Sequence, residues 1–450
     1  MTADLLIHNA LIVNEGARFR GWVAVTGGFI SAVGRDDAPQ ELLQGAAETV
    51  DAQGRFLLPG AIDEHVHFRD PGLTHKADMA CETAAAAAGG VTSFIDMPNT
   101  IPQSTTRAAV ADKMHRAAAV ATANYGFYIG ATNDNIDELT AADFSTIAGV
   151  KLFLGSSTGN MLVDSNQTIR RIFEDVDALI AVHAESEAII AENRSRFKAE
   201  RGDNLPVELH PLIRSRRACF EATKAAVEMA RATGARLHVL HISTADELAL
   251  FTPGAVESKR ITAETCPQYL LFDDGDYAER GARVKCNPAI KSPLDRAALL
   301  EAVATGRIDC VATDHAPHLL AEKQGNALTA VSGMPMIQFS LPAMLTLADE
   351  GAFTIEKVVE TMAHNPARLY GIVGRGFIRQ GCYADLALVE RADTVVSDAD
   401  VLSRCGWTPL AGIMLRYRVA STWLNGRRVW DGHRVDPTVR GMALRYCRKP

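Results

Sequence analysis

The sequence predicts an α/β fold, a (β/α)8 barrel of the TIM type with a small β-sandwich formed from both chain ends. Short apolar segments alternate with helical stretches through the middle of the chain, and strand-like segments occupy its two ends. The 450 residues suffice for one large barrel with a smaller companion. We therefore expect residues 56–365 to form the barrel, and residues 1–55 and 366–450 to form the two parts of the sandwich.

The first 55 residues have the pattern of short strands separated by turns. Gly27-Gly28 lies between β-branched runs and is typical of a two-residue hairpin turn. Strand-like segments return after the last helical stretch, near residue 384. The segments expected as terminal strands lie within residues 4–13, 21–34, 47–60, 384–390 and 417–430.

Eight apolar segments in the middle of the chain are candidates for the barrel strands. Strands inside such a barrel are buried on both faces and are therefore apolar throughout. Helical spacing appears between them, as in residues 217–234, where Gly234 is a typical helix stop. The eight segments are residues 60–68, 90–97, 124–131, 148–155, 178–185, 235–242, 259–265 and 308–315.

The composition is that of an ordinary globular protein, and it disfavours nucleic acid and membranes as partners. A formal net charge of -8 gives no electrostatic basis for binding nucleic acid or an anionic membrane. No run approaches the roughly 18 apolar residues that span a bilayer. The eight cysteines form no close pairs, and the N-terminus lacks signal-peptide features, so we expect reduced thiols and a cytoplasmic protein.

Polar side chains that would be costly to bury fall at the carboxyl ends of the expected strands, where barrels of this type carry their chemistry. Taken singly, each has an ordinary explanation, such as a hydrogen-bonded core histidine or a helix-capping aspartate. His238, three residues before His241, faces the opposite way and is interpreted as structural. Six residues that share one rim nevertheless predict a metal site: His65, His67, Lys151, His183, His241 and Asp314.

Four imidazoles and one carboxylate suit zinc better than calcium or magnesium. Five ligands are too many for one open tetrahedral zinc and too few for two without a bridge. Lys151 is the candidate bridge, because an amine beside two dications should be neutral. A neutral amine can take up carbon dioxide, and the resulting carbamate offers two oxygens to two Zn²⁺ ions. This carboxylation is a hypothesis from charge balance.

Several motifs give the chain a resemblance to the amidohydrolase superfamily, within it to the cyclic-amide hydrolases, and among these to the type I dihydroorotases. They are "PGAIDEHVHFRDPG", "DMPNT", "KLFLG", "VHAES", "LHVLHIST", "ETCPQYL" and "ATDHAPH". The resemblance implies a barrel with a β-sandwich. It also implies one metal on His65, His67 and Asp314, a second on His183 and His241, and a carboxylated Lys151 between them.

The same resemblance implies a set of substrate contacts. Arg69, Asn99 and His318 match positions that bind the ring carboxylate of dihydroorotate, Asn287 matches one that holds the ring, and Gly333 matches one that offers backbone contacts. Without the family, Arg69 could equally pair with a nearby aspartate, and the two asparagines could shape turns. The "NPAIK" and "SGMPM" segments depart from the usual family patterns, as does Gln268.

The implied reaction is the reversible hydrolysis of L-dihydroorotate to N-carbamoyl-L-aspartate in pyrimidine synthesis. A metal-bridging hydroxide would attack, and Asp314 would act first as general base and then as general acid. The alternatives are a dihydropyrimidinase or hydantoinase, an allantoinase, and a non-catalytic scaffold for aspartate transcarbamoylase. Beyond a small-molecule substrate, the expected partners are further copies of the chain or that transcarbamoylase.

Overall fold

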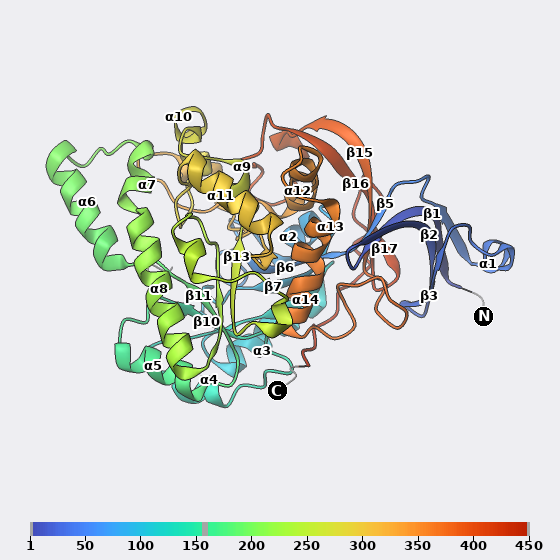
Figure 1. Cartoon of the computed structure of the whole chain (residues 1–450), viewed down its shortest axis with the longest axis horizontal. Coiled ribbons are helices and arrows are strands. Elements are labelled where there is room, and N and C mark those ends of the chain that lie inside the picture. The colour runs from blue at the N-terminus through green and yellow to red at the C-terminus, as the bar shows by residue number, and fades with distance from the viewer. Residues whose placement is uncertain (1–2, 155–160, 448–450) are drawn as a thin grey trace.

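The computed structural model describes residues 3–154 and 161–447 and has a mixed α/β fold (Figure 1). A body of parallel strands covered by helices lies beside a mainly antiparallel sheet, which carries the N-terminus at its far end. Gly155, the last residue of the fourth expected barrel strand, lies outside the described residues.

The two chain ends contribute strands to one sheet, while their predicted arrangement as a sandwich stays a prediction. The order of this sheet is β17-β16-β15-β5-β1-β2-β3, with β4 paired to β1. The antiparallel pair β5–β15 joins the N-terminal strands to the C-terminal strands, with Leu57 opposite Leu388. The strands are β1 (Leu5–Asn14), β2 (Ala17–Thr26), β3 (Phe29–Arg35), β4 (Glu48–Asp51), β5 (Phe56–Pro59), β15 (Leu386–Val395), β16 (Met414–Leu424) and β17 (Arg427–Trp430), and the short helix α1 (Gln40–Gly45) follows β3.

The predicted hairpin turn at Gly27-Gly28 is confirmed. Thr26 pairs with Phe29, so two residues connect β2 to β3. The two glycines have φ angles of 61° and 84°. Two consecutive positive φ angles are what a type I′ turn requires, and glycine adopts them at the lowest cost.

Each of the eight expected barrel segments contains parallel strand structure. Two sheets follow the chain order, β6-β7-β8 and β9-β10-β11-β12-β13-β14, and a parallel bridge from Val66 to His315 connects the last strand to the first. The third segment contains both β8 and β9, with Tyr128 between them. The carboxyl ends of all these strands therefore point to one rim. The strands are β6 (Ala61–Val66), β7 (Val91–Asp96), β8 (Asn124–Phe127), β9 (Ile129–Gly130), β10 (Val150–Phe153), β11 (Leu179–His183), β12 (Arg236–Val239), β13 (Ile261–Thr265) and β14 (Cys310–Val311).

Helices cover the outside of these strands. The helix predicted near residues 217–234 is α8, which the Ser215 hydroxyl caps by accepting from Ala218 N and which ends at Gly234 with a φ of 77°. A π-helical turn, Glu360–His364, separates α13 from α14. The helices are α2 (Met79–Ala88), α3 (Arg107–Val120), α4 (Ile136–Thr140), α5 (Asn166–Asp175), α6 (Glu187–Arg201), α7 (His210–Ile213), α8 (Arg216–Thr233), α9 (Pro267–Leu271), α10 (Asp276–Arg280), α11 (Pro293–Ala304), α12 (Ser340–Asp349), α13 (Ile355–Val359) and α14 (Asn365–Tyr370).

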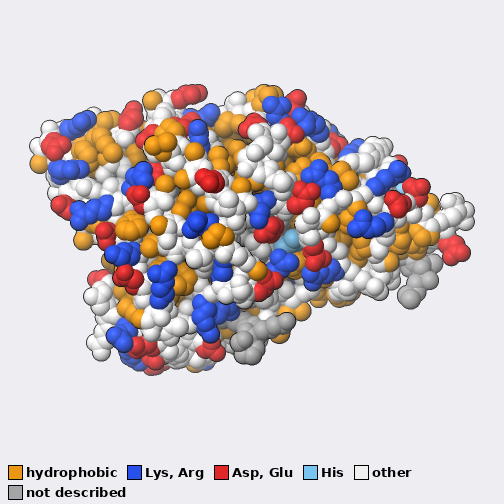
Figure 2. Space-filling model, viewed as in Figure 1, with side chains coloured by type: hydrophobic (Ala, Val, Ile, Leu, Met, Phe, Trp, Pro, Cys, Tyr) orange, Lys and Arg blue, Asp and Glu red, His pale blue; other side chains and the backbone are white. Residues whose placement is uncertain are grey.

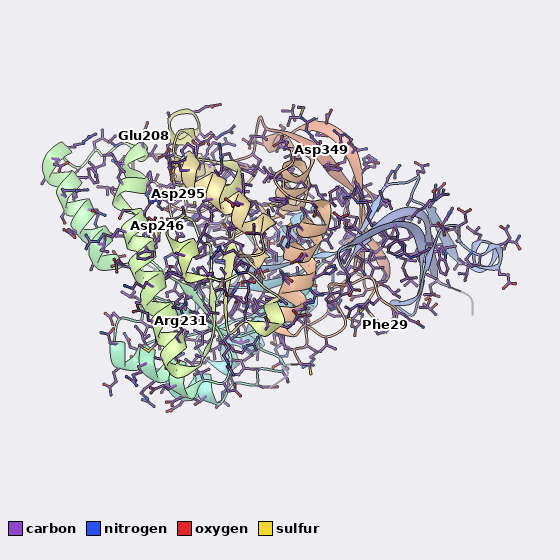
Figure 3. All side chains as sticks on the ribbon, in the orientation of Figure 1. Phe29, Glu208, Arg231, Asp246, Asp295 and Asp349 are labelled. Atoms are coloured by element: carbon purple, nitrogen blue, oxygen red, sulfur yellow. The ribbon has the colours of Figure 1, made fainter. Side chains whose placement is uncertain are left out.

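Polar contacts fix the terminal sheet to the helical layer. Asp349, at the end of α12, lies beside β15 and β16 (Figure 3), and its Oδ1 is 2.6 Å from Arg391 Nη1. The buried His364 ring donates from Nδ1 to Gly376 O at 2.7 Å and accepts at Nε2 from Glu15 N at 2.8 Å. These side chains therefore connect a strand and a turn of the sheet to the helices that cover the parallel strands.

The surface carries both signs of charge. Lys and Arg side chains are interspersed with Asp and Glu over the face seen in Figure 2, as a modest net charge would give. Within the described residues, the helices include none of the length and apolarity needed to cross a bilayer. All eight cysteines are free thiols, as the absence of close pairs in the sequence predicts.

Candidate metal centre

Three predicted ligands converge at the ends of the parallel strands β6 and β14. His65 lies on β6, His67 follows it, and Asp314 follows β14. Asp314 Oδ1 is 3.2 Å from His65 Nε2 and 3.0 Å from His67 Nε2. One donor atom from each residue lies within 4.8 Å of the others, which places three ligand atoms around one point. This is the spacing that a bound divalent metal needs.

The other two histidines form a pair beside this trio. His183 ends β11 and His241 follows β12, and His183 Nδ1 is 2.9 Å from His241 Nε2. The ring centroids of His65 and His241 are 5.3 Å apart, so the pair adjoins the trio. His241 and Asp314 have φ angles of 42° and 46°, a region that non-glycine residues seldom adopt. Such local backbone strain is common where a side chain must be aimed at a functional site.

Lys151, on β10, places an unusual group in the same space. Its Nζ is buried, has no hydrogen-bond partner among the described residues, and lies 4.6 Å from the centre of the Phe153 ring. Burial lowers the pKa of this amine to about 7, although the charges of Asp314 and Glu264 oppose the shift. A buried amine that loses its charge readily and has no hydrogen-bond partner within the described residues fits a position for an anionic modification or a metal.

The protonation states of the cluster also suit metal binding. Burial lowers the pKa of His65, His183 and His241, so these rings are neutral and offer a lone pair. Burial alone would raise the pKa of Asp314, but the neighbouring rings of His65 and His67 outweigh it and lower that pKa. The donor set is therefore four imidazoles, three of them kept neutral by burial, and a carboxylate, which fits zinc.

Three histidines each have a side-chain oxygen near a ring nitrogen, in a role that the sequence interpretation did not identify. Glu264 Oε1 is 2.9 Å from His65 Nδ1, and Asn99 Oδ1 is 2.7 Å from His67 Nδ1. Glu185 Oε2 is 3.1 Å from His183 Nε2 and also pairs with the buried Arg214. Glu264 and Asn99 are acceptors of the kind that fix the tautomer and the orientation of a ligating imidazole, whereas His183 Nε2 makes no hydrogen bond within the described residues. The Nε2 atoms of His65 and His67 both face Asp314 Oδ1, and His183 Nδ1 faces His241 Nε2.

Two of the predicted substrate contacts lie together beside the trio. Arg69, two residues after His67, donates from Nε to Pro317 O at 3.1 Å, and its Nη2 is 3.1 Å from His318 Nε2. The Trp407 indole donates to His318 O at 2.7 Å and holds the segment. Arg69 is therefore engaged with His318 and not with the nearby aspartates.

The other three predicted contacts differ in how they are placed. Asn99 uses its Oδ1 on His67, which leaves the amide Nδ2 as its donor. Asn287 Oδ1 is buried and has no hydrogen-bond partner within the described parts of the chain. Gly333 packs against the His318 ring, while its N–H donates to Lys285 O at 2.9 Å and its carbonyl accepts from Lys323 Nζ at 2.8 Å. Both backbone groups of Gly333 thus have protein partners, and its role toward substrate stays a prediction.

Comparison with known proteins places this arrangement in a family. A model described as "Amidohydrolase family" matches residues 56–429, which include all six predicted metal ligands. The chain belongs to the amidohydrolase family. This amidohydrolase is 36% identical over 396 residues to a dihydroorotase of Halobacterium salinarum, an alignment that covers 86% of the chain and 89% of the relative. It is also 36% identical over 444 residues to an allantoinase of Streptomyces avermitilis, with 97% and 98% covered.

A solved structure extends the likeness. L-Hydantoinase (dihydropyrimidinase) from Arthrobacter aurescens superimposes with a TM-score of 0.90 at 27% identity, covering 96% of this chain and 97% of that one. The amidohydrolase described here thus lies among cyclic amidohydrolases whose names refer to different substrates. Its overall fold and its enzyme class follow from these relatives, and its substrate must come from the site.

Proposed function

We propose that this amidohydrolase is a dihydroorotase, which hydrolyses L-dihydroorotate reversibly to N-carbamoyl-L-aspartate in the synthesis of pyrimidine nucleotides. The observation that carries the proposal is the Arg69–His318 pair beside the metal trio, 3.1 Å apart. Dihydroorotate bears a ring carboxylate that a buried guanidinium binds well, whereas a neutral ring would leave Arg69 without an anion. The proposal includes a (β/α)8 barrel over about residues 56–365, flanked by a β-sandwich from the two chain ends.

Six residues would hold the metals. His65, His67 and Asp314 would bind one Zn²⁺ ion, and His183 and His241 a second, with a carboxylated Lys151 between them. The buried Lys151 amine without a partner supports this arrangement. Bound zinc would supply a Lewis acid and lower the pKa of water enough to provide a nucleophile near neutral pH.

The side chains of the chain itself divide the remaining work. Arg69, His318 and the Nδ2 amide of Asn99 hold the ring carboxylate, and Asn287 orients the ring. Asp314 Oδ1, 3.0 Å and 3.2 Å from two imidazoles, stays ionised and accepts the proton of the attacking water. It then returns that proton to the departing ring nitrogen, acting as base and then as acid.

One observation favours allantoinase as a second candidate function. The alignment to the Streptomyces avermitilis allantoinase covers 97% of the chain, against 86% for the Halobacterium salinarum dihydroorotase at the same 36% identity. Overall similarity therefore does not separate the two substrates. The residues that would bind the ring carboxylate decide between them.

The test is ring opening by the zinc-loaded protein of L-dihydroorotate, allantoin and dihydrouracil in parallel. We expect turnover of dihydroorotate, and an Asp314→Asn variant should lose at least about 100-fold in kcat with little change in substrate binding. Turnover of allantoin or dihydrouracil alone would refute the proposed substrate. Near-full turnover by Asp314→Asn would refute the proton-transfer role.

A further inference from the structure

The His318 ring has a cationic group at each of its two nitrogens. Its Nε2 is 3.1 Å from Arg69 Nη2, and its Nδ1 is 3.2 Å from Lys76 Nζ. A guanidinium and an ammonium only donate hydrogen bonds, and a neutral imidazole has a single accepting nitrogen. One of the two contacts therefore cannot be a hydrogen bond. The cluster holds more donors than its own acceptors can use.

These three groups are largely removed from solvent. The His318 side chain is 12% exposed and the Lys76 side chain 13%, and Arg69 is 5% exposed. Burial, and then the positive charges of Arg69 and Lys76, lower the pKa of His318, so the ring is neutral. Two cations beside a neutral ring in a low-dielectric space favour an added anion.

Glu322 supplies part of the missing negative charge. Its Oε1 is 2.6 Å from Lys76 Nζ, and its Oε2 accepts from Leu319 N at 2.9 Å. Its Oε2 is 3.8 Å from His318 Nδ1, too far for a hydrogen bond. Glu322 therefore engages Lys76 from one side and does not satisfy the His318 ring.

We propose that Lys76 is a specificity-determining residue: with the Arg69 guanidinium and the neutral His318 ring it forms the third arm, and the second cation, of a clamp that binds the carboxylate of an anionic cyclic amide. The proposal rests on the proposed dihydroorotase function and adds a residue to it. The two oxygens of a carboxylate offer about four acceptor sites, and these can take the N–H groups of Arg69, Lys76 and His318 that have no acceptor in the cluster. Lys76 exchanges Glu322 for this carboxylate, since an ammonium on a flexible stem can change partners at small cost.

The exchange predicts opposite effects for the two sides of the ion pair. Removing the Lys76 charge removes one arm, so the carboxylate binds more weakly. Removing the Glu322 charge leaves Lys76 without its protein partner, which competes with the substrate carboxylate, so the carboxylate binds more tightly. A glutamine at position 322 keeps an oxygen that accepts from Leu319 N. A general loss of structure would weaken binding in both variants, which separates it from the exchange.

The experiment is calorimetric titration of the zinc-loaded protein with orotate and with uracil, a ring pair that differs by the carboxylate. We expect Lys76→Met to weaken orotate binding about 10- to 100-fold, the usual size for a lost hydrogen bond to a charged group. Glu322→Gln should tighten orotate binding by about threefold or more, which we set as the smallest informative change. Uracil binding should stay within about twofold in both variants, within the scatter of such contacts. Lys224→Met, on the outer face of α8, is the matched control, and it should leave both titrations unchanged.

Several outcomes would overturn the inference: no binding of orotate by the wild type, unchanged orotate binding by Lys76→Met, equal weakening of orotate and uracil, or a Glu322→Gln variant that binds orotate no more tightly. Turnover of L-dihydroorotate is measured separately. If Lys76→Met loses orotate but the wild type does not open dihydroorotate, the proposed function fails and the clamp stands. If the wild type opens dihydroorotate and Lys76→Met keeps its KM, the clamp fails and the function stands.

Discussion

The substitution Lys113→Met tests how the loop that carries His67 and Arg69 is held. Lys113 reaches inward from α3, pairs with Asp96 at the end of β7, and donates to Met97 O at 2.9 Å. Asp96 Oδ1 in turn accepts from Phe68 N at 2.9 Å, between the two site residues. The ion pair thus holds the carboxylate that binds the backbone between His67 and Arg69.

The size of the effect follows from the burial of both charges. The side chains of Lys113 and Asp96 are 1% and 0% exposed. Removing one partner of such a pair leaves an uncompensated charge and costs about 3–5 kcal/mol, whereas an exposed pair contributes about 0–1 kcal/mol. In the double variant Lys113→Met/Asp96→Asn both charges are gone, and the asparagine oxygen still accepts from Phe68 N. We therefore expect the double variant to recover most of the lost stability.

The assay is equilibrium urea unfolding followed by the far-ultraviolet circular dichroism of the helices. Lys113→Met should unfold at clearly lower urea than the wild type, and Lys224→Met, a lysine on the exposed face of α8, should not. The reasoning is refuted if Lys113→Met lies within about 1 kcal/mol of the wild type, the value of an exposed pair. It is also refuted if the double variant is no more stable than the single one.

Two further predictions concern the centre and its connection to the terminal sheet. Glu264→Gln should weaken zinc binding about 10- to 100-fold, because Glu264 orients His65. Competition with a chelator measures the zinc affinity, and an unchanged affinity would contradict the orienting role of Glu264. Burial lowers the pKa of His364 from 6.5 to about 4, so the unfolded chain takes up the proton first as the pH falls below 6.5. The stability that this ring contributes is complete above pH about 6.5 and is lost progressively toward pH about 4, by about 2 kcal/mol at pH about 5. Urea unfolding at pH about 7 and at pH about 5 measures how far the free energy of unfolding falls between the two. This fall should be larger by that amount in the wild type than in His364→Gln, and an equal fall in both proteins would contradict the pKa shift.

The positions of most strands could be predicted from the sequence, because a strand's burial is visible in the local pattern of apolar and polar residues. A barrel strand buried on both faces must be apolar, and a costly polar residue at its end is conspicuous. His183 after "LIAV" and Asp314 after "CVAT" are examples, and the structure brings Asp314 to His65 and His67. The two-residue turn at Gly27-Gly28 was predictable for the same local reason.

The partners of these residues were beyond the reach of local pattern. Glu264 meets His65 across 199 positions of sequence, and Lys76 meets His318 across 242. Nothing in the spacing of a lone buried acid or lysine tells which distant side chain it will face. Asn99 shows the same limit: its motif suggested a substrate contact, while its Oδ1 holds His67. Contacts between strand ends depend on how the strands close, and only the folded chain shows this.

The pairing of β5 with β15 has a consequence for how the chain must be made. Strand β5 ends at Pro59 and β15 begins at Leu386, so the ribosome synthesises more than three hundred residues between the two neighbours. At typical rates of translation this interval lasts on the order of tens of seconds. Throughout it the first strands have an open edge of unpaired backbone groups, the kind of edge that recruits foreign strands. This topology therefore favours protection of the nascent N-terminal strands, by a chaperone or by early packing against the segments that follow them.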